Sequence, residues 1–131
     1  KIQANHAGVD SALMLDNLGF IAEMNGTNIF LIKKGKLLTP TADACLHGIT
    51  RGLVLEIALE NGIEVEVRNI SLTELYSADE AFGTGSMGEL TPIKEVDGRM
   101  LQNRSGTQMT QELIKLFADT HKKWSTSIAN L

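Results

Sequence analysis

The sequence predicts a single α/β domain in which helices cover a largely antiparallel or mixed sheet. Short apolar runs separated by turn residues dominate the first forty residues, as is typical of β-strands. Two later stretches, 51–60 and 107–117, instead carry apolar residues at helical spacing. A length of 131 residues, with 43% hydrophobic and 21% charged content, suits one compact domain that can bury a core. We therefore expect residues 1–131 to form one domain.

Residues 1–40 predict a β-meander that follows the end of a helix. The composition of residues 1–7 is typical of the last turns of a helix already under way before Gly8. The predicted strands are short apolar runs between turn residues: 11–15, 20–23, 28–33 and 37–39. Glu23 ends the second of these strands, just before a loop, which makes its carboxylate a candidate site residue.

The remainder of the chain predicts helices alternating with strands. The helical pattern that begins at Arg51 ends at Gly62, and Ser71 followed by Glu74 is typical of a capping box. The other predicted elements follow in chain order: a strand at 63–68, a strand that begins at 78–82, a strand at 90–96, a turn at 97–98 and a helix from 107. The tail 122–131 carries no informative pattern.

The stretch Leu46–Gly52 predicts a helix N-terminus that could hold an anion. Gly48 allows close approach of a ligand to the backbone, and Thr50 can cap the helix. The free amides of a first helical turn, together with the helix dipole, favour a phosphate or a carboxylate. Ordinary capping explains the same residues, so both interpretations stay open at this point.

A second candidate anion site is the glycine- and hydroxyl-rich loop 83–89, between two extended stretches. Successive backbone amides in such a loop can form an anion-binding nest, although a plain glycine-rich turn or bulge fits as well. Two anion-seeking backbone sites and the carboxylate of Glu23 suggest a ligand that carries two anionic groups.

Several other function classes are disfavoured. The net charge of −4 and the aromatic content of 5% argue against a nucleic-acid partner, and the apolar runs are too short to cross a membrane. His6, His47 and His121 lie far apart in the sequence, so we expect no metal site. The single Cys45 cannot form an internal disulfide, which suits a reducing cytoplasm.

Three motifs in order resemble those of one enzyme family. They are Glu23 with Thr27–Phe30, then Leu46–Arg51, then Gly85–Pro92. Together they resemble the class IV (fold type IV) pyridoxal-phosphate aminotransferases, over about residues 1–118. This family includes the branched-chain and D-amino-acid aminotransferases and aminodeoxychorismate lyase. The resemblance implies the C-terminal cofactor-binding domain of such an enzyme, a mixed sheet that curls into a pseudo-barrel flanked by helices.

The resemblance also implies which residues hold pyridoxal 5′-phosphate. Glu23 would pair with the pyridine nitrogen and favour its protonated form. Leu46 would pack on one face of the ring. The amides of Ile49 and Thr50, next to Gly48, would form the phosphate cup. Outside this set, Asn28 and Arg51 would hold loops in place.

The loop that begins at Gly85 would complete the site. By resemblance, Ser86 would contact the phosphate and the substrate, and the amide of Met87 would hold the substrate carboxylate. The loop is closer to the branched-chain version of the motif than to the D-amino-acid version, although Met87 and Gly88 replace the usual small pair.

The family's Schiff-base lysine should lie upstream of Lys1, so no catalytic residue is expected within this chain. The chain is therefore expected to be a fragment that lacks the N-terminal domain and is inactive alone. The resemblance implies that the full-length enzyme is a homodimer that exchanges an amino group between a branched-chain amino acid and a 2-oxo acid. The alternatives are a lyase like aminodeoxychorismate lyase, a D-amino-acid aminotransferase, or a non-catalytic phosphate-binding fragment.

Overall fold

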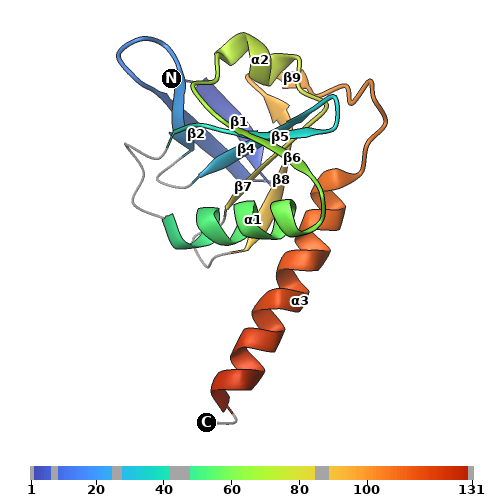
Figure 1. The fold of residues 1–131 in the computed structure, drawn as a ribbon. Coiled ribbons are helices and arrows are strands. Elements are labelled where there is room, and N and C mark those ends of the chain that lie inside the picture. Colours follow the sequence, from blue (N-terminus) through green and yellow to red (C-terminus); the bar gives the residue numbers. More distant parts are fainter. Residues whose placement is uncertain (1, 7–8, 25–27, 42–47, 85–88, 130–131) are drawn as a thin grey trace.

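The computed structural model describes residues 2–6, 9–24, 28–41, 48–84 and 89–129 (Figure 1). The strands are β1 Ile2–His6, β2 Val9–Leu15, β3 Ile21–Met24, β4 Ile29–Lys33, β5 Lys36–Thr39, β6 Glu64–Val67, β7 Glu80–Thr84, β8 Leu90–Val96 and β9 Arg99–Met100. The helices are α1 Gly48–Glu60, α2 Leu72–Tyr76 and α3 Met109–Ala129. Within these described residues, no helix combines the length and the apolar character that a membrane span needs.

The described strands form one mixed sheet, as the sequence predicts. Its order is β3-β2-β1-β8-β7-β4-β5-β6, with β9 paired to β8. Only β5 and β6 pair in parallel; the other pairings between described strands are antiparallel. Beyond β6, Ser71 forms an isolated bridge with Phe20, and the Ile21 amide donates to the Ile70 carbonyl at 2.9 Å. These contacts bring the two ends of the sheet together, which gives the expected pseudo-barrel.

The expected N-terminal helix is wrong, because Ile2–His6 is a strand. Strand β1 pairs on one side with β2, where Ile2 lies opposite Leu13. On the other side it pairs with β8, where Ala4 lies opposite Val96. Helix propensity is a weak local preference, and a strand with partners on both sides satisfies its backbone through tertiary pairing instead.

The expected meander is wrong in part. Two of the three successive pairings of the predicted meander form, β2 with β3 and β4 with β5. However, β4 does not continue the ladder from β3; its other partner is β7, and Phe30 lies opposite Phe82. Local turn residues specify hairpins, whereas the order of hairpins in a sheet depends on contacts that are distant in sequence.

Strand β4 is buried on both faces and separates two apolar clusters. Ile29 and Leu31 belong to a cluster inside the curled sheet, with residues such as Ile70 and Leu75. Phe30 and Ile32 belong to a second cluster, which packs under α1 and α3. The rings of Phe30 and Phe82 stack there with centroids 4.9 Å apart. The alternation of side chains along a strand explains this two-sided core.

The three helices begin and end through distinct contacts. Helix α1 ends as predicted before Gly62, whose φ is +73°. At the start of α2 the predicted capping box is present, because Ser71 accepts from the Glu74 amide and the Glu74 side chain accepts from the Ser71 amide. At the start of α3, the Glu80 carboxylate accepts from the amides of Met109 and Thr110 at 2.9 and 3.0 Å. Helix α3 continues through most of the tail for which the sequence predicts no element.

Candidate functional site

Helix α1 begins within the stretch Leu46–Gly52, where the sequence predicts a helix N-terminus. The helix begins at Gly48, and its first turn carries no acidic side chain. The first amides of a helix have no partner within the helix and lie at the positive end of its dipole. The side chain of Ile49 is 91% exposed and Thr50 is half-buried. Thr50 is the third residue of the helix, so the expectation that it caps the helix is wrong, while its amide does belong to the first turn.

Arg51 ties this helix start to the end of β5. Its Nη2 donates to the Pro40 carbonyl at 3.1 Å. This contact is the loop-holding role expected for Arg51. It also leaves a guanidinium within the first turn of α1, so the local charge adds to the positive end of the dipole.

Two buried hydrogen bonds lock the end of β7 to the start of β4. The Thr84 amide donates to the Asn28 carbonyl at 3.0 Å, and the Asn28 amide donates to Thr84 Oγ1 at 3.2 Å. Asn28 is 4% exposed and Thr84 is 1% exposed. The backbone of Asn28 therefore joins two chain segments, and the predicted role of Asn28 in holding a loop stays a prediction. The part played by Thr84 was missed, although its position directly before Gly85 was a usable signal.

Thr39, at the end of β5, extends this arrangement to a third strand. Its Oγ1 donates to the Ile29 carbonyl at 2.9 Å, and Thr39 is 1% exposed. Since Arg51 contacts Pro40, the residue after Thr39, the starts of α1 and β4 and the ends of β5 and β7 share one edge of the sheet. Asn28, Thr39 and Thr84, which join the strand ends, are buried and uncharged, whereas Arg51 is charged and half-buried.

Glu23 precedes Asn28, at this edge, by five residues in the sequence. Its backbone pairs with Met14 of β2, and β3 ends one residue later. Met24 and Asn28 are four Cα steps apart, which limits their separation to about 15 Å at ~3.8 Å per step. The register of β2 with β3 shifts between Met14 and Leu15, which indicates a bulge next to Glu23.

The other predicted site residues, Leu46, Gly85, Ser86 and Met87, lie outside the described residues. Described segments flank them closely, since β7 ends at Thr84 and α1 begins at Gly48. The described residues contain no cluster of three or more His, Cys, Asp or Glu side chains that could hold a metal ion.

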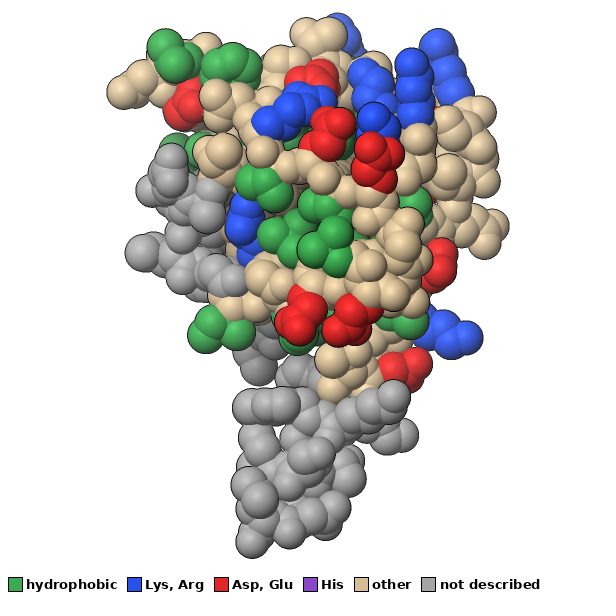
Figure 2. Space-filling view, viewed as in Figure 1, with side chains coloured by type: hydrophobic (Ala, Val, Ile, Leu, Met, Phe, Trp, Pro, Cys, Tyr) green, Lys and Arg blue, Asp and Glu red, His purple; other side chains and the backbone are tan. Residues whose placement is uncertain are grey.

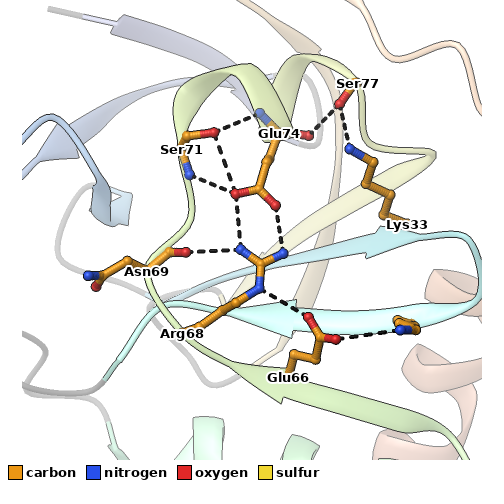
Figure 3. A network of polar contacts seen from close by, with 8 residues as sticks. Lys33, Glu66, Arg68, Asn69, Ser71, Glu74 and Ser77 are labelled. Atoms are coloured by element: carbon orange, nitrogen blue, oxygen red, sulfur yellow. Dashed lines mark hydrogen bonds and ion pairs between the residues drawn. The ribbon is translucent and has the colours of Figure 1, made fainter.

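A charged network that the sequence did not predict surrounds Arg68, just after β6 (Figure 3). Arg68 contacts both Glu74 and Glu66, and Lys36 lies 3.5 Å from Glu66. The hydrogen bonds from Arg68 lower the pKa of Glu74 to about 2 and lower that of Glu66, while Glu74 raises the pKa of Arg68. Basic and acidic side chains lie side by side in the upper part of Figure 2, where α2 lies in Figure 1. All three groups therefore stay charged near neutral pH.

Asp79 is a separate buried carboxylate, 7% exposed, that organises backbone rather than a site. It accepts from the Lys34 amide at 3.0 Å and from the Ser105 amide at 3.1 Å. Desolvation opposes ionisation of Asp79, but these hydrogen bonds outweigh it and lower the pKa. Its oxygens serve the β4–β5 turn and the segment before α3.

The fold and the edge described above define an α/β domain with a helix N-terminus suited to an anion, and comparison with known proteins identifies its family. The family model for amino-transferase class IV matches residues 1–96, and the chain belongs to that family. A putative branched-chain-amino-acid aminotransferase of Methanocaldococcus jannaschii is 45% identical over 129 residues, covering 98% of this chain and 45% of that protein.

Two further matches agree with this family. The branched-chain-amino-acid aminotransferase of Pseudomonas aeruginosa is 42% identical over 133 residues, covering 96% of this chain and 43% of that protein. The structure of the Thermobaculum terrenum branched-chain amino acid aminotransferase in its PLP form matches with a TM-score of 0.78 and 38% identity, covering 86% of this chain and 38% of that one. The chain thus spans less than half the length of these relatives.

Proposed function

We propose that residues 1–131 form the cofactor-binding C-terminal domain of a pyridoxal-phosphate-dependent aminotransferase that acts on branched-chain amino acids. The observation that carries this proposal is the shared edge where the starts of α1 and β4 meet the ends of β5 and β7. Membership of the class IV family and the names of the relatives support the choice of reaction and substrate.

The residues at α1 fit a phosphate group. The first turn offers backbone amides, carries no carboxylate and includes the guanidinium of Arg51. A doubly charged phosphate would gain from both the amides and the positive helix end. We assign the phosphate to the amides of Ile49 and Thr50, next to Gly48, with further contacts from Gly85 and Ser86.

The remaining assignments follow the family resemblance. Glu23 would hold a proton on the pyridine nitrogen, and Leu46 would pack on the ring. Ser86 and the Met87 amide would bind the substrate carboxylate. When bound, pyridoxal phosphate supplies the electron-withdrawing ring that amino transfer requires. Ser86 and the Met87 amide would orient the substrate against that ring.

Other parts of the proposed enzyme would come from outside this chain. We propose that the Schiff-base lysine belongs to an N-terminal domain, and that two copies of the full-length protein form a homodimer. The second substrate would be a 2-oxo acid. A cytoplasmic location is proposed from the single Cys45, which suits a reducing compartment.

A spectroscopic experiment tests the proposed function. The full-length protein, loaded with pyridoxal phosphate, should show a visible cofactor band that L-leucine converts to the pyridoxamine form and that a 2-oxo acid restores. Conversion by D-leucine alone would instead favour the D-amino-acid enzymes, and release of pyruvate from aminodeoxychorismate would favour the lyase. A protein that binds no cofactor would contradict the proposal. The 131-residue chain alone should bind the cofactor weakly and reversibly.

A further inference from the structure

The pair formed by Arg68 and Glu74 is held at two points (Figure 3). Arg68 Nη1 donates to Glu74 Oε1 at 3.0 Å, and Nη2 donates to Oε2 at 2.6 Å. Nε of Arg68 donates to Glu66 at 3.0 Å, and Nη1 also donates to the Asn69 carbonyl at 3.0 Å. A two-point contact between a guanidinium and a carboxylate fixes their relative orientation. The end of β6 is therefore held against α2.

The Glu74 carboxylate also contacts Ser71, within the turn formed by residues 68–74. Glu74 Oε1 accepts from the Ser71 amide at 3.2 Å, and the Glu74 amide donates to Ser71 Oγ at 3.2 Å. Glu74 thus caps α2 and binds Arg68 at once. The backbone between Arg68 and Ser71 is consequently fixed at both of its ends.

On the side away from β2, the start of β3 contacts this fixed backbone. The Ile70 carbonyl accepts from the Ile21 amide at 2.9 Å, and Ser71 bridges Phe20. Ile70 and Ile21 are 0% and 2% exposed and lie in the same apolar cluster. Hydrogen bonding and packing therefore act together on the start of β3.

On its other side β3 pairs with β2, and this ladder is irregular. Met14 lies opposite Glu23, whereas Leu15 lies opposite Ile21, so the register shifts within β3 itself. A bulge bends a strand and interrupts its ladder. The contacts with Ile70 and Ser71 act just before this irregularity, and Glu23 follows just after it.

We propose that the Arg68–Glu74 pair positions the Glu23 end of β3, through the turn that β3 contacts. Arg68 and Glu74 are positioning residues here, and the proposal rests on the proposed function of Glu23. Loss of the pair should let the turn and the start of β3 shift, and small shifts in an active site reduce turnover strongly. The turn lies far from Glu23 in sequence, so only the fold connects them.

Two variants of the full-length protein isolate the ion pair. Glu74→Gln removes the pair and keeps the cap, because glutamine serves in a capping box as glutamate does. Arg68→Lys keeps the charge and loses the two-point contact. Glu64→Gln is the matched control, because Glu64 of β6 forms a 3.7 Å ion pair with Lys36 of β5 and its side chain is 65% exposed. Melting temperatures show that each variant folds.

Amide hydrogen exchange in the absence of cofactor gives the first readout. Exchange at Ile21, Ala22 and Glu23 should rise roughly five- to tenfold in Glu74→Gln and Arg68→Lys, as expected for loss of a partly exposed ion pair. Exchange in β8 and in the Glu64→Gln control should match the unaltered protein. Unchanged exchange in β3 would overturn the proposal.

The cofactor-loaded protein gives the second readout. In Glu74→Gln the pH midpoint of the visible cofactor band should shift, and kcat should fall about tenfold while KM changes less than twofold. A purely structural role would lower the melting temperature and leave the midpoint and kcat unchanged, which would overturn the positioning role. If the unaltered protein binds no cofactor, the proposed function and the role for Glu23 fail, whereas the exchange data still decide whether the pair holds β3.

Discussion

The sheet edge at the start of α1 and the turn around Arg68 are both held by hydrogen bonds, but of opposite kinds. At the edge, Asn28 and Thr84 lie far apart in sequence, are buried and use uncharged groups. At the turn, Arg68 and Glu74 lie six residues apart, are charged and stay partly exposed. Buried neutral contacts depend on packing, whereas exposed charge pairs are weakened by salt and acid. The edge should therefore respond to core substitutions and the turn to solution conditions.

The largest expected effect comes from the packing behind the edge. Phe82→Ala removes a ring that stacks on Phe30 and is 0% exposed. We expect the free energy of unfolding to fall by about 3–5 kcal/mol, from lost apolar burial and the cavity left behind. Urea denaturation measures this change. Met100→Ala is the control, because Met100 is 63% exposed, and it should change the free energy of unfolding little. An equally small change in Phe82→Ala would contradict the dependence of the edge on packing.

A smaller effect is expected from the edge hydrogen bond itself. Thr84→Val keeps the side-chain volume but removes the oxygen that accepts from the Asn28 amide. The lost partner at a buried site should cost about 1–3 kcal/mol. Chemical denaturation and cofactor titration of the full-length protein measure stability and affinity. Thr84→Ser should retain the bond, and equal behaviour of the valine and serine variants would argue against this hydrogen bond.

At the turn, removal of the helix cap should cost less. Ser71→Ala deletes the oxygen that accepts from the Glu74 amide. The expected loss is about 1 kcal/mol, as for N-cap substitutions in general. Thermal unfolding at two salt concentrations measures it. The loss should be nearly independent of salt, in contrast to the loss in Glu74→Gln, and a salt-sensitive Ser71→Ala variant would show that the cap acts through the ion pair.

The smallest expected effect is the loss of stability at low pH through protonation of Glu74. The pKa of Glu74 is lowered from 4.5 to about 2, so its folded form binds the proton less readily than the unfolded chain. The associated stability is present above about pH 4.5 and is lost as the pH falls toward 2. Partial exposure limits it to roughly 1 kcal/mol or less. Unfolding followed from pH 6 to pH 2.5 should show a shallower slope in Glu74→Gln, and identical slopes would contradict the ion pair.

Local signals predicted the parts of the fold that are held locally. The turn residues between the predicted strands 11–15 and 20–23 predicted the β2–β3 hairpin, and Ser71 with Glu74 predicted the cap of α2; both are confirmed. Strand β1 could not be predicted in this way, because its residues suit a helix and its pairing with β8 depends on distant residues. The capping of α3 by Glu80 was hidden for the same reason.

In the candidate site, too, features set by local residues were predicted, whereas features set by distant contacts were not. The helix start at Gly48 follows from local residue types, and the expected role of Arg51 in holding a loop is confirmed. Thr39 looks like an ordinary strand residue in sequence, and Thr84 falls in the predicted loop 83–89; the packed sheet shows that their hydroxyls join strand ends. The roles assigned to Glu23, Leu46, Ser86 and Met87 remain predictions.

The position of β1 between β2 and β8 has a consequence for the order of folding. Strand β1 can pair with β2 as soon as residue 15 has been made, but Ala4 pairs on its other side only after Val96 has been made. Pairing between residues so distant in sequence slows folding, because the intervening chain loses its freedom before the contact compensates. During synthesis the open side of β1 is an unpaired strand edge, and it is the place where a newly made chain would most easily join with another.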